Sequence, residues 1–183
     1  MKYFGAIHRV ILDATIIKKA EDFATQVTAT TNYADSNQLS AVKISNDHFI
    51  SKIGEEAVKH MLGKYASVVG PDYAIYQAKQ KSWADDLYVN GIGLAVKTQK
   101  RTTAKQFGLS WTFQAGPARC DVILKKPDAW VAFVMYDDIE GNVCYVYPPF
   151  QMKELVLGEP VLAKLKGYKK VVYAKTLPLV NRT

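Results

Sequence analysis

The feature that most constrains the fold is a change in hydrophobic periodicity near residue 70. Before this point, apolar residues recur three and four positions apart, which is typical of amphipathic helices. After it, short segments rich in β-branched and aromatic residues are separated by turn residues, which is typical of strands. This order predicts an α/β or α+β fold with a central mixed β-sheet flanked by helices.

The spacing predicts a helix over residues 7–27 and a second within residues 46–66, ending at Gly63 or the following VVGP segment. IEGN before Val143 predicts a hairpin turn, and short helices are expected near residues 101–105 and 153–157. Strands are predicted over residues 72–78, 86–91, 91–99, 110–114, 130–138, 142–149 and 169–174.

Length and composition indicate a single folded domain. The chain has 183 residues, of which 49% are hydrophobic, enough for one core and too few for two ordinary domains. We therefore expect one domain over residues 1–183, with a helical part at about 1–65 and a sheet core at about 70–175.

The charge of the chain favours a polyanionic partner. The formal net charge is +7, and no long apolar span or basic amphipathic helix accompanies it, so nucleic acid is a better candidate than a membrane. Cys120 and Cys144 lack metal-ligand spacing and are interpreted as reduced core residues. Charge appears too early at the N-terminus for a secretory signal, so we expect a cytoplasmic protein, for which a phage origin stays open.

The stretch DDLYVNGIGLAVKTQ, residues 85–99, reads as two strands joined by a glycine-containing turn. Side chains alternate along a strand, so Leu94 and Val96 are expected in the core while Lys97 faces a cleft. Asp86 begins the preceding strand, and pairing of the two strands would bring its carboxylate toward Lys97. Glu55, on the second expected helix, would add another carboxylate.

Carboxylates beside a lysine suit metal-dependent phosphodiester hydrolysis. Carboxylate oxygens hold Mg²⁺, the metal acidifies water, and an ammonium group positions or deprotonates the attacking water. In the order helix, strand, strand, the segments GEEAV, DD and AVK resemble the PD-(D/E)XK nuclease superfamily. This resemblance covers about residues 53–114. It implies a restriction-endonuclease-like fold, with Glu55 (Glu56 in reserve) and Asp86 as Mg²⁺ ligands and Lys97 as the catalytic lysine.

The sequence departs from this family at Ala95, which stands where the pattern has Asp or Glu. Alanine cannot bind a metal. Three accounts are open: the site is naturally inactive, another group such as Glu55 or Gln99 substitutes, or Ala95 is an inactivating replacement made to trap a complex. The otherwise intact surroundings favour the last account.

Basic and hydroxyl side chains around this stretch are expected to contact DNA phosphates, although a solvated charged connection would look the same. Segments 32–38 and 114–119 are candidates for reading bases. The N-terminus of the short helix near Arg101 could also face a phosphate. The expected DNA-binding residues are Lys79, Lys81, Gln99, Lys100, Arg101, Thr102, Thr103 and Lys105.

The function expected from these features is that of a Mg²⁺-dependent, site-specific endonuclease that cleaves double-stranded DNA, of the restriction or phage homing type. A homodimer is expected because one site per chain usually needs two chains to cut both strands. Two alternatives stay open. The chain could be a nuclease-like module that binds DNA without cleaving it, or a structural phage or host-interaction protein with no salt-dependent DNA binding.

Overall fold

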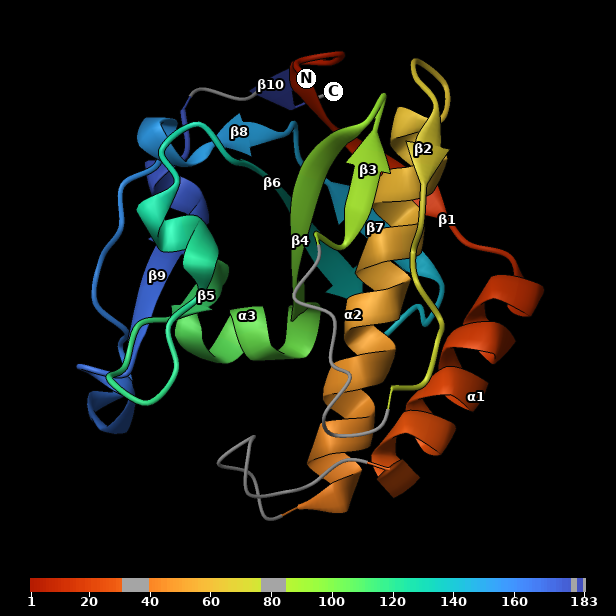
Figure 1. The fold of residues 1–183 in the computed structure, drawn as a ribbon, viewed down its shortest axis with the longest axis horizontal. Coiled ribbons are helices and arrows are strands. Elements are labelled where there is room, and N and C mark those ends of the chain that lie inside the picture. Colours follow the sequence, from red (N-terminus) through yellow and green to blue (C-terminus); the bar gives the residue numbers. More distant parts are fainter. Residues whose placement is uncertain (31–39, 77–84, 179–180, 183) are drawn as a thin grey trace.

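The computed structural model describes residues 1–30, 40–76, 85–178 and 181–182. It is a mixed α/β structure in which helices flank a curled, mixed central sheet (Figure 1). The predicted central mixed sheet with flanking helices is therefore confirmed.

The central sheet joins strands from nearly the whole chain. Its order is β10-β1-β7-β6-β4-β3-β2, and β8 pairs with β6 beside this path. The strands are β1 (Ala6–Ile11), β2 (Val68–Val69), β3 (Leu87–Val89), β4 (Ile92–Lys100), β6 (Trp130–Asp137), β7 (Val143–Val146), β8 (Phe150–Gln151) and β10 (Asn181–Arg182). The β4–β6 and β1–β10 pairs are parallel, and the other pairs are antiparallel.

Helices α1 (Ala14–Thr30) and α2 (Ala41–Leu62) lie together on one side of this sheet (Figure 1). The Ser40 hydroxyl accepts a hydrogen bond from the Lys43 N–H and so begins α2 with a side-chain cap. The helix ends before Gly63, as the sequence predicts. Its buried face packs Ile53, Ala57 and other apolar side chains against β4 and β6, forming the first hydrophobic core.

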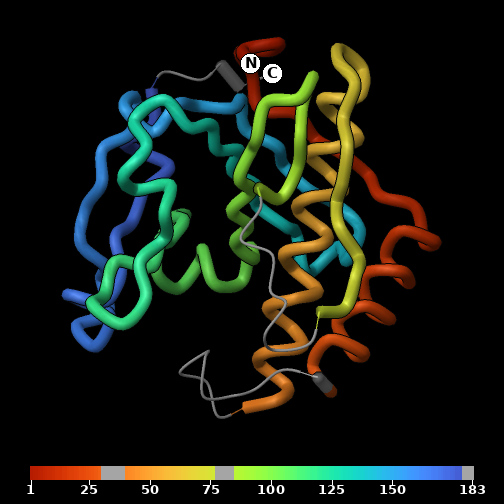
Figure 2. Tube along the Cα trace, viewed as in Figure 1, coloured from red at the N-terminus to blue at the C-terminus, as the bar shows by residue number. Residues whose placement is uncertain are grey.

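A second, two-stranded sheet covers the opposite face of β4 and β6. It pairs β5 (Ser110–Gln114) with β9 (Lys169–Tyr173), and helix α3 (Arg101–Phe107) leads from β4 into it. Trp111 and Phe113 of β5 pack with Phe133 of β6 in the second hydrophobic core. In the chain trace, α2 and the β5–β9 sheet accordingly lie on opposite sides of β4 (Figure 2).

The helix predicted over residues 7–27 is wrong over residues 7–13. Residues Ala6–Ile11 form β1, which pairs with β7 in the central sheet, and the helix begins only at Ala14. The β-branched side chains in this segment suit a strand. The start of the helix is fixed by Asp13, whose Oδ1 accepts hydrogen bonds from the N–H groups of Thr15 and Ile16.

The predicted strand over residues 72–78 is also wrong for its described part. Residues 72–76 form no strand, and the Asp72 side chain instead accepts a hydrogen bond from the Ala74 N–H, which favours a local turn. The strands predicted at 110–114, 130–138, 142–149 and 169–174 are present with small changes at their ends, and so is the hairpin turn before Val143.

Three smaller expectations have mixed outcomes. The short helix expected at 101–105 is α3, whereas the one expected at 153–157 is a single 3-10 turn at Met152–Glu154. Cys144 is buried as predicted, but Cys120 is exposed and does not belong to the core. Among the described helices, none is both long enough and apolar enough to cross a membrane.

Candidate functional site

The candidate site lies where the β3–β4 hairpin opens. Asn90 and Gly91 both have positive φ, +48° and +79°, as a tight two-residue hairpin turn requires. The last pair of the ladder is Leu87 with Leu94, so Asp86 and Ala95 are the next residues opposite each other on the two strands. There the Asp86 Oδ2 accepts a hydrogen bond of 2.7 Å from the Val96 N–H. The carboxylate thus takes the place of a strand partner.

The two faces of β4 have different surroundings. Leu94 and Val96 pack into the first core beneath α2, whereas Ala95 packs against the second core. The Lys97 ammonium lies 5.1 Å from the centre of the Phe113 ring, on the side of the β5–β9 sheet. The predicted alternation is confirmed, and Ala95 shares a face with Lys97.

Glu55 is buried next to this hairpin. Its Oε2 accepts a hydrogen bond of 2.6 Å from the Lys52 ammonium, and the two side chains are only 6% and 12% exposed. Burial and the neighbouring Asp86 carboxylate raise the pKa of Glu55 to about 8, although Lys52 opposes the shift. Burial also raises the pKa of Asp86, against the Val96 hydrogen bond and the charges of Lys97 and Lys52. Two carboxylates are therefore held close together in a poorly hydrated place.

Glu56 points elsewhere. Its Oε1 accepts a hydrogen bond of 3.0 Å from the Tyr73 hydroxyl, and the residue is 7% exposed. Of the two helix acids in GEEAV, Glu55 is the one whose pKa the Asp86 charge raises. Neither glutamate lies on a solvated helix face.

Lys97 has a partner that the sequence does not reveal. Its ammonium lies 3.0 Å from the Asp121 Oδ2, and the same oxygen accepts a hydrogen bond of 3.1 Å from the Gln114 N–H. Lys97 also acts electrostatically on Asp86. This lysine therefore lies between the Asp86 carboxylate and the β5–β9 sheet.

A further carboxylate lies near Ala95. A Cβ placed on Gly93 would come within 1.9 Å of the Asp85 Oδ2, so the Asp85 side chain lies directly over Gly93. Gly93 and Ala95 are two positions apart on β4 and share a face. Asp85 also contributes to the raised pKa of Asp86.

These residues do not complete a Mg²⁺ site as they stand. Within the part of the chain that the structure describes, no group of three or more His, Cys, Asp or Glu side chains is arranged to hold a metal ion. Ala95 has no side-chain atom that could bind a metal, and the Glu55 carboxylate already accepts a hydrogen bond from the Lys52 ammonium. The carboxylates that remain fall short of the oxygen-rich set that Mg²⁺ prefers.

Three of the expected DNA-binding side chains are engaged by Asp137 and Asp138. Arg101 donates a hydrogen bond of 2.6 Å to the fully buried Asp137. The Asp138 carboxylate accepts hydrogen bonds from the Thr102 N–H and hydroxyl and lies 3.8 Å from the Lys100 ammonium. The N-terminus of α3 is thus already capped by a carboxylate.

The other expected contacts have different surroundings. The Gln99 side chain accepts a hydrogen bond from the Ser110 N–H and donates one to the Gly108 carbonyl, so it joins β4 to β5. Thr103 is half-buried and Lys105 is exposed on α3. Lys79 and Lys81, and the proposed base-reading segment 32–38, lie outside the described residues.

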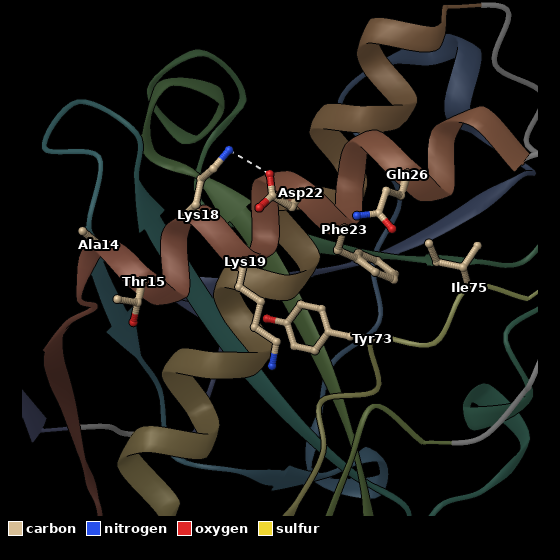
Figure 3. Close-up of a pocket in the computed structure, with 9 residues that line it drawn as sticks. All are labelled: Ala14, Thr15, Lys18, Lys19, Asp22, Phe23, Gln26, Tyr73 and Ile75. Carbon is tan, nitrogen blue, oxygen red and sulfur yellow. Dashed lines mark hydrogen bonds and ion pairs between the residues drawn. The ribbon is translucent and has the colours of Figure 1, made fainter.

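A separate pocket of about 560 Å³ lies beside α1 (Figure 3). Its two lysines are already engaged, because Lys18 pairs with Asp22 and the Lys19 ammonium lies 3.9 Å from the centre of the Tyr73 ring. None of the candidate site residues lines it. The pocket therefore does not belong to the candidate site.

Three residues that the structure places around the site were not expected from the sequence. Lys52 could have been found from its i, i+3 spacing to Glu55 on a helix. Asp121 and Lys169 carry no local signal, because they reach the site only through the pairing of β5 with β9 and the turn after β5.

Comparison of the chain with protein-family models, curated proteins and solved structures gave no match.

Proposed function

We propose that this chain is a double-stranded DNA-binding domain built on the plan of a PD-(D/E)XK endonuclease, with a restriction-endonuclease-like fold. In this proposal, the reaction of the family is site-specific, Mg²⁺-dependent hydrolysis of phosphodiester bonds. The site for this reaction lacks one carboxylate, because Ala95 stands in its place. The restriction and phage homing types are equally compatible with it, as is the homodimer that would cut both strands.

One observation carries the proposal. Asp86 lies opposite Ala95, one position beyond the last ladder pair of the hairpin; Lys97 shares the face of Ala95, and Glu55 lies beside Asp86. The order of a helix followed by two strands, expected from the resemblance, is present as α2 before β3 and β4. A net charge of +7 suits a polyanionic partner.

The chain's own residues prepare the site without a metal. The Val96 N–H fixes the Asp86 carboxylate, and Lys52 fixes Glu55. Lys97 places an ammonium on the face where the missing acid would project. When bound, Mg²⁺ would acidify a water molecule and stabilise the leaving oxygen.

The test restores the acid. Ala95→Glu is compared with the chain as it stands, with Ala95→Gln as a control of equal size, and with Ala95→Glu combined with Lys97→Ala. Supercoiled plasmid is incubated with each protein in Mg²⁺ or in EDTA. We expect discrete cleavage only by Ala95→Glu in Mg²⁺, and loss of that cleavage when Lys97 is removed as well.

The second candidate is a module that binds DNA and never cleaves it. Glu55 is paired with Lys52, and Lys97 is paired with Asp121. These pairings favour this candidate, because the carboxylate and the lysine that would act in hydrolysis are already neutralised. If Ala95→Glu folds and binds DNA but leaves the plasmid intact, the endonuclease proposal is wrong and this module replaces it. If no variant binds DNA with salt dependence, both are wrong.

A further inference from the structure

Several lysines meet between α2, β4 and the β5–β9 sheet, and they differ from the residues that the sequence predicts to bind DNA. Lys97 projects from β4, Lys43 from the first turn of α2, and Lys169 from the first position of β9. We call Lys43, Lys97 and Lys169 the lysine cluster. They are far apart in the sequence, and only the tertiary fold brings them together.

The geometry links two members of the cluster through Asp121 and Gln114. Lys97 pairs with Asp121, whose Oδ2 also accepts a hydrogen bond from the Gln114 N–H. Gln114 is the cross-strand partner of Lys169 in the β5–β9 ladder. Lys169 therefore enters the same small region as Lys97 from the neighbouring strand.

The environment of Lys169 is unfavourable for an ammonium group without an anion. The residue is half-buried, and its pKa is lowered by burial first and then by the positive charges of Lys43 and Lys97. Among the described residues, the Lys169 ammonium has no hydrogen bond or ion pair, although Asp47 and Asp121 act on it electrostatically. Placing a partly desolvated cation beside two others costs free energy that a bound anion would offset.

We propose that Lys43 and Lys169 of the lysine cluster bind backbone phosphates of double-stranded DNA, with Lys97 held by Asp121 beside them, so that the β5–β9 sheet forms a second contact surface beside the candidate site. This inference rests on the proposed function and specifies where the duplex lies. The proposed contacts take the place of those expected from Lys100, Arg101 and Thr102, because Asp137 and Asp138 already engage these three residues.

The experiment measures duplex binding by fluorescence anisotropy in EDTA over a series of salt concentrations. Lys169→Gln and Lys43→Gln each remove one charge from the cluster, and Lys169→Arg keeps it. Lys64→Gln is the matched control, because Lys64 is exposed just beyond the other end of α2. At 1.5 Å per residue, the control lies roughly 30 Å along the helix from Lys43.

Each cluster variant should bind severalfold more weakly and lower the slope of log affinity against log salt by about one, as expected for one lost phosphate contact. Lys169→Arg and Lys64→Gln should keep the slope of the unchanged chain. Asp47→Asn should bind more tightly, because it removes an exposed carboxylate beside Lys43 and Lys169. A general loss of folding could not produce that gain.

Three results would overturn the inference. The first is an unchanged affinity and slope for Lys169→Gln and Lys43→Gln. The second is an equal loss for Lys64→Gln, which would mean that only net charge matters. The third is an absence of salt-dependent DNA binding by the unchanged chain, and that result alone would also overturn the proposed function.

Discussion

Replacing Gly54 with alanine should destabilise this protein, although the same change usually stabilises a helix. Gly54 is buried in α2 against β4. A Cβ there would lie 1.8 Å from the Thr98 Oγ1, 3.0 Å from its Cβ and 3.1 Å from its Cγ2. Rotation of Thr98 would move Oγ1 and Cγ2 but leave Cβ in place, so rotation alone cannot relieve the contact.

The magnitude follows from two opposing effects. Alanine in a helix interior gains about 1 kcal/mol over glycine. Overpacking of a tight core contact costs about 1–3 kcal/mol, and the short distance here points to the upper end. We therefore expect a net loss of about 2 kcal/mol in the free energy of unfolding, or a fall of roughly 4–8 °C in Tm for a chain of this size.

Urea denaturation of the four proteins of a double-mutant cycle, with one control variant, would separate the effects. Thr98→Ala alone should change stability little, because two effects oppose each other. Loss of the methyl group destabilises the folded state, whereas loss of a buried hydroxyl without a hydrogen-bond partner among the described residues stabilises it. In the Thr98→Ala background, Gly54→Ala should cost at least about 1 kcal/mol less, which a double-mutant cycle measures as coupling. Ser51→Ala, at an exposed position of α2, is the control for helix propensity. Equal or greater stability of Gly54→Ala in the otherwise unchanged chain would refute the reasoning.

Two further predictions concern buried carboxylates. The raised pKa of Glu55, about 8 against an ordinary 4.5, means that the folded state binds more protons than the unfolded state between these values. Stability should therefore fall as pH rises through this range, by at most about 1.4 kcal/mol per pH unit. Glu55→Gln should flatten that dependence in denaturation curves taken from pH 5 to 8, and an unchanged slope would contradict the assignment. Arg101→Ala should cost about 2 kcal/mol in thermal or urea denaturation because it leaves the buried Asp137 without its charged partner. Arg9→Ala, which breaks an exposed pair, should have no measurable effect, and equal losses from the two changes would count against this explanation.

The sequence alone was enough for the local features of the sheet. The Asn90–Gly91 turn and the alternation of Leu94, Ala95, Val96 and Lys97 are properties of neighbouring residues, and the structure has them as predicted. The same local reasoning failed at residues 6–11. There the apolar spacing suits a helix, but pairing with β7, more than 130 positions later, makes the segment a strand.

For the candidate site, the sequence determined which carboxylates and lysines are available, and their order along the chain. Only the tertiary structure decided which of them meet. It directs Glu55 toward Asp86 and Glu56 toward Tyr73, although the two glutamates are adjacent. It engages Arg101 with Asp137, and it brings Lys169 close to Lys97.

The physical reason is that helix and turn formation depend on neighbouring residues, whereas burial and charge pairing depend on contacts between distant ones. The separation between Lys97 and Asp121, or between Lys43 and Lys169, carries no periodic signal. Their proximity follows from the β4–β6 and β5–β9 ladders, whose side chains form the two hydrophobic cores. The sequence thus specified the chemistry available to this protein, and the packing of the two sheets determined where that chemistry is placed.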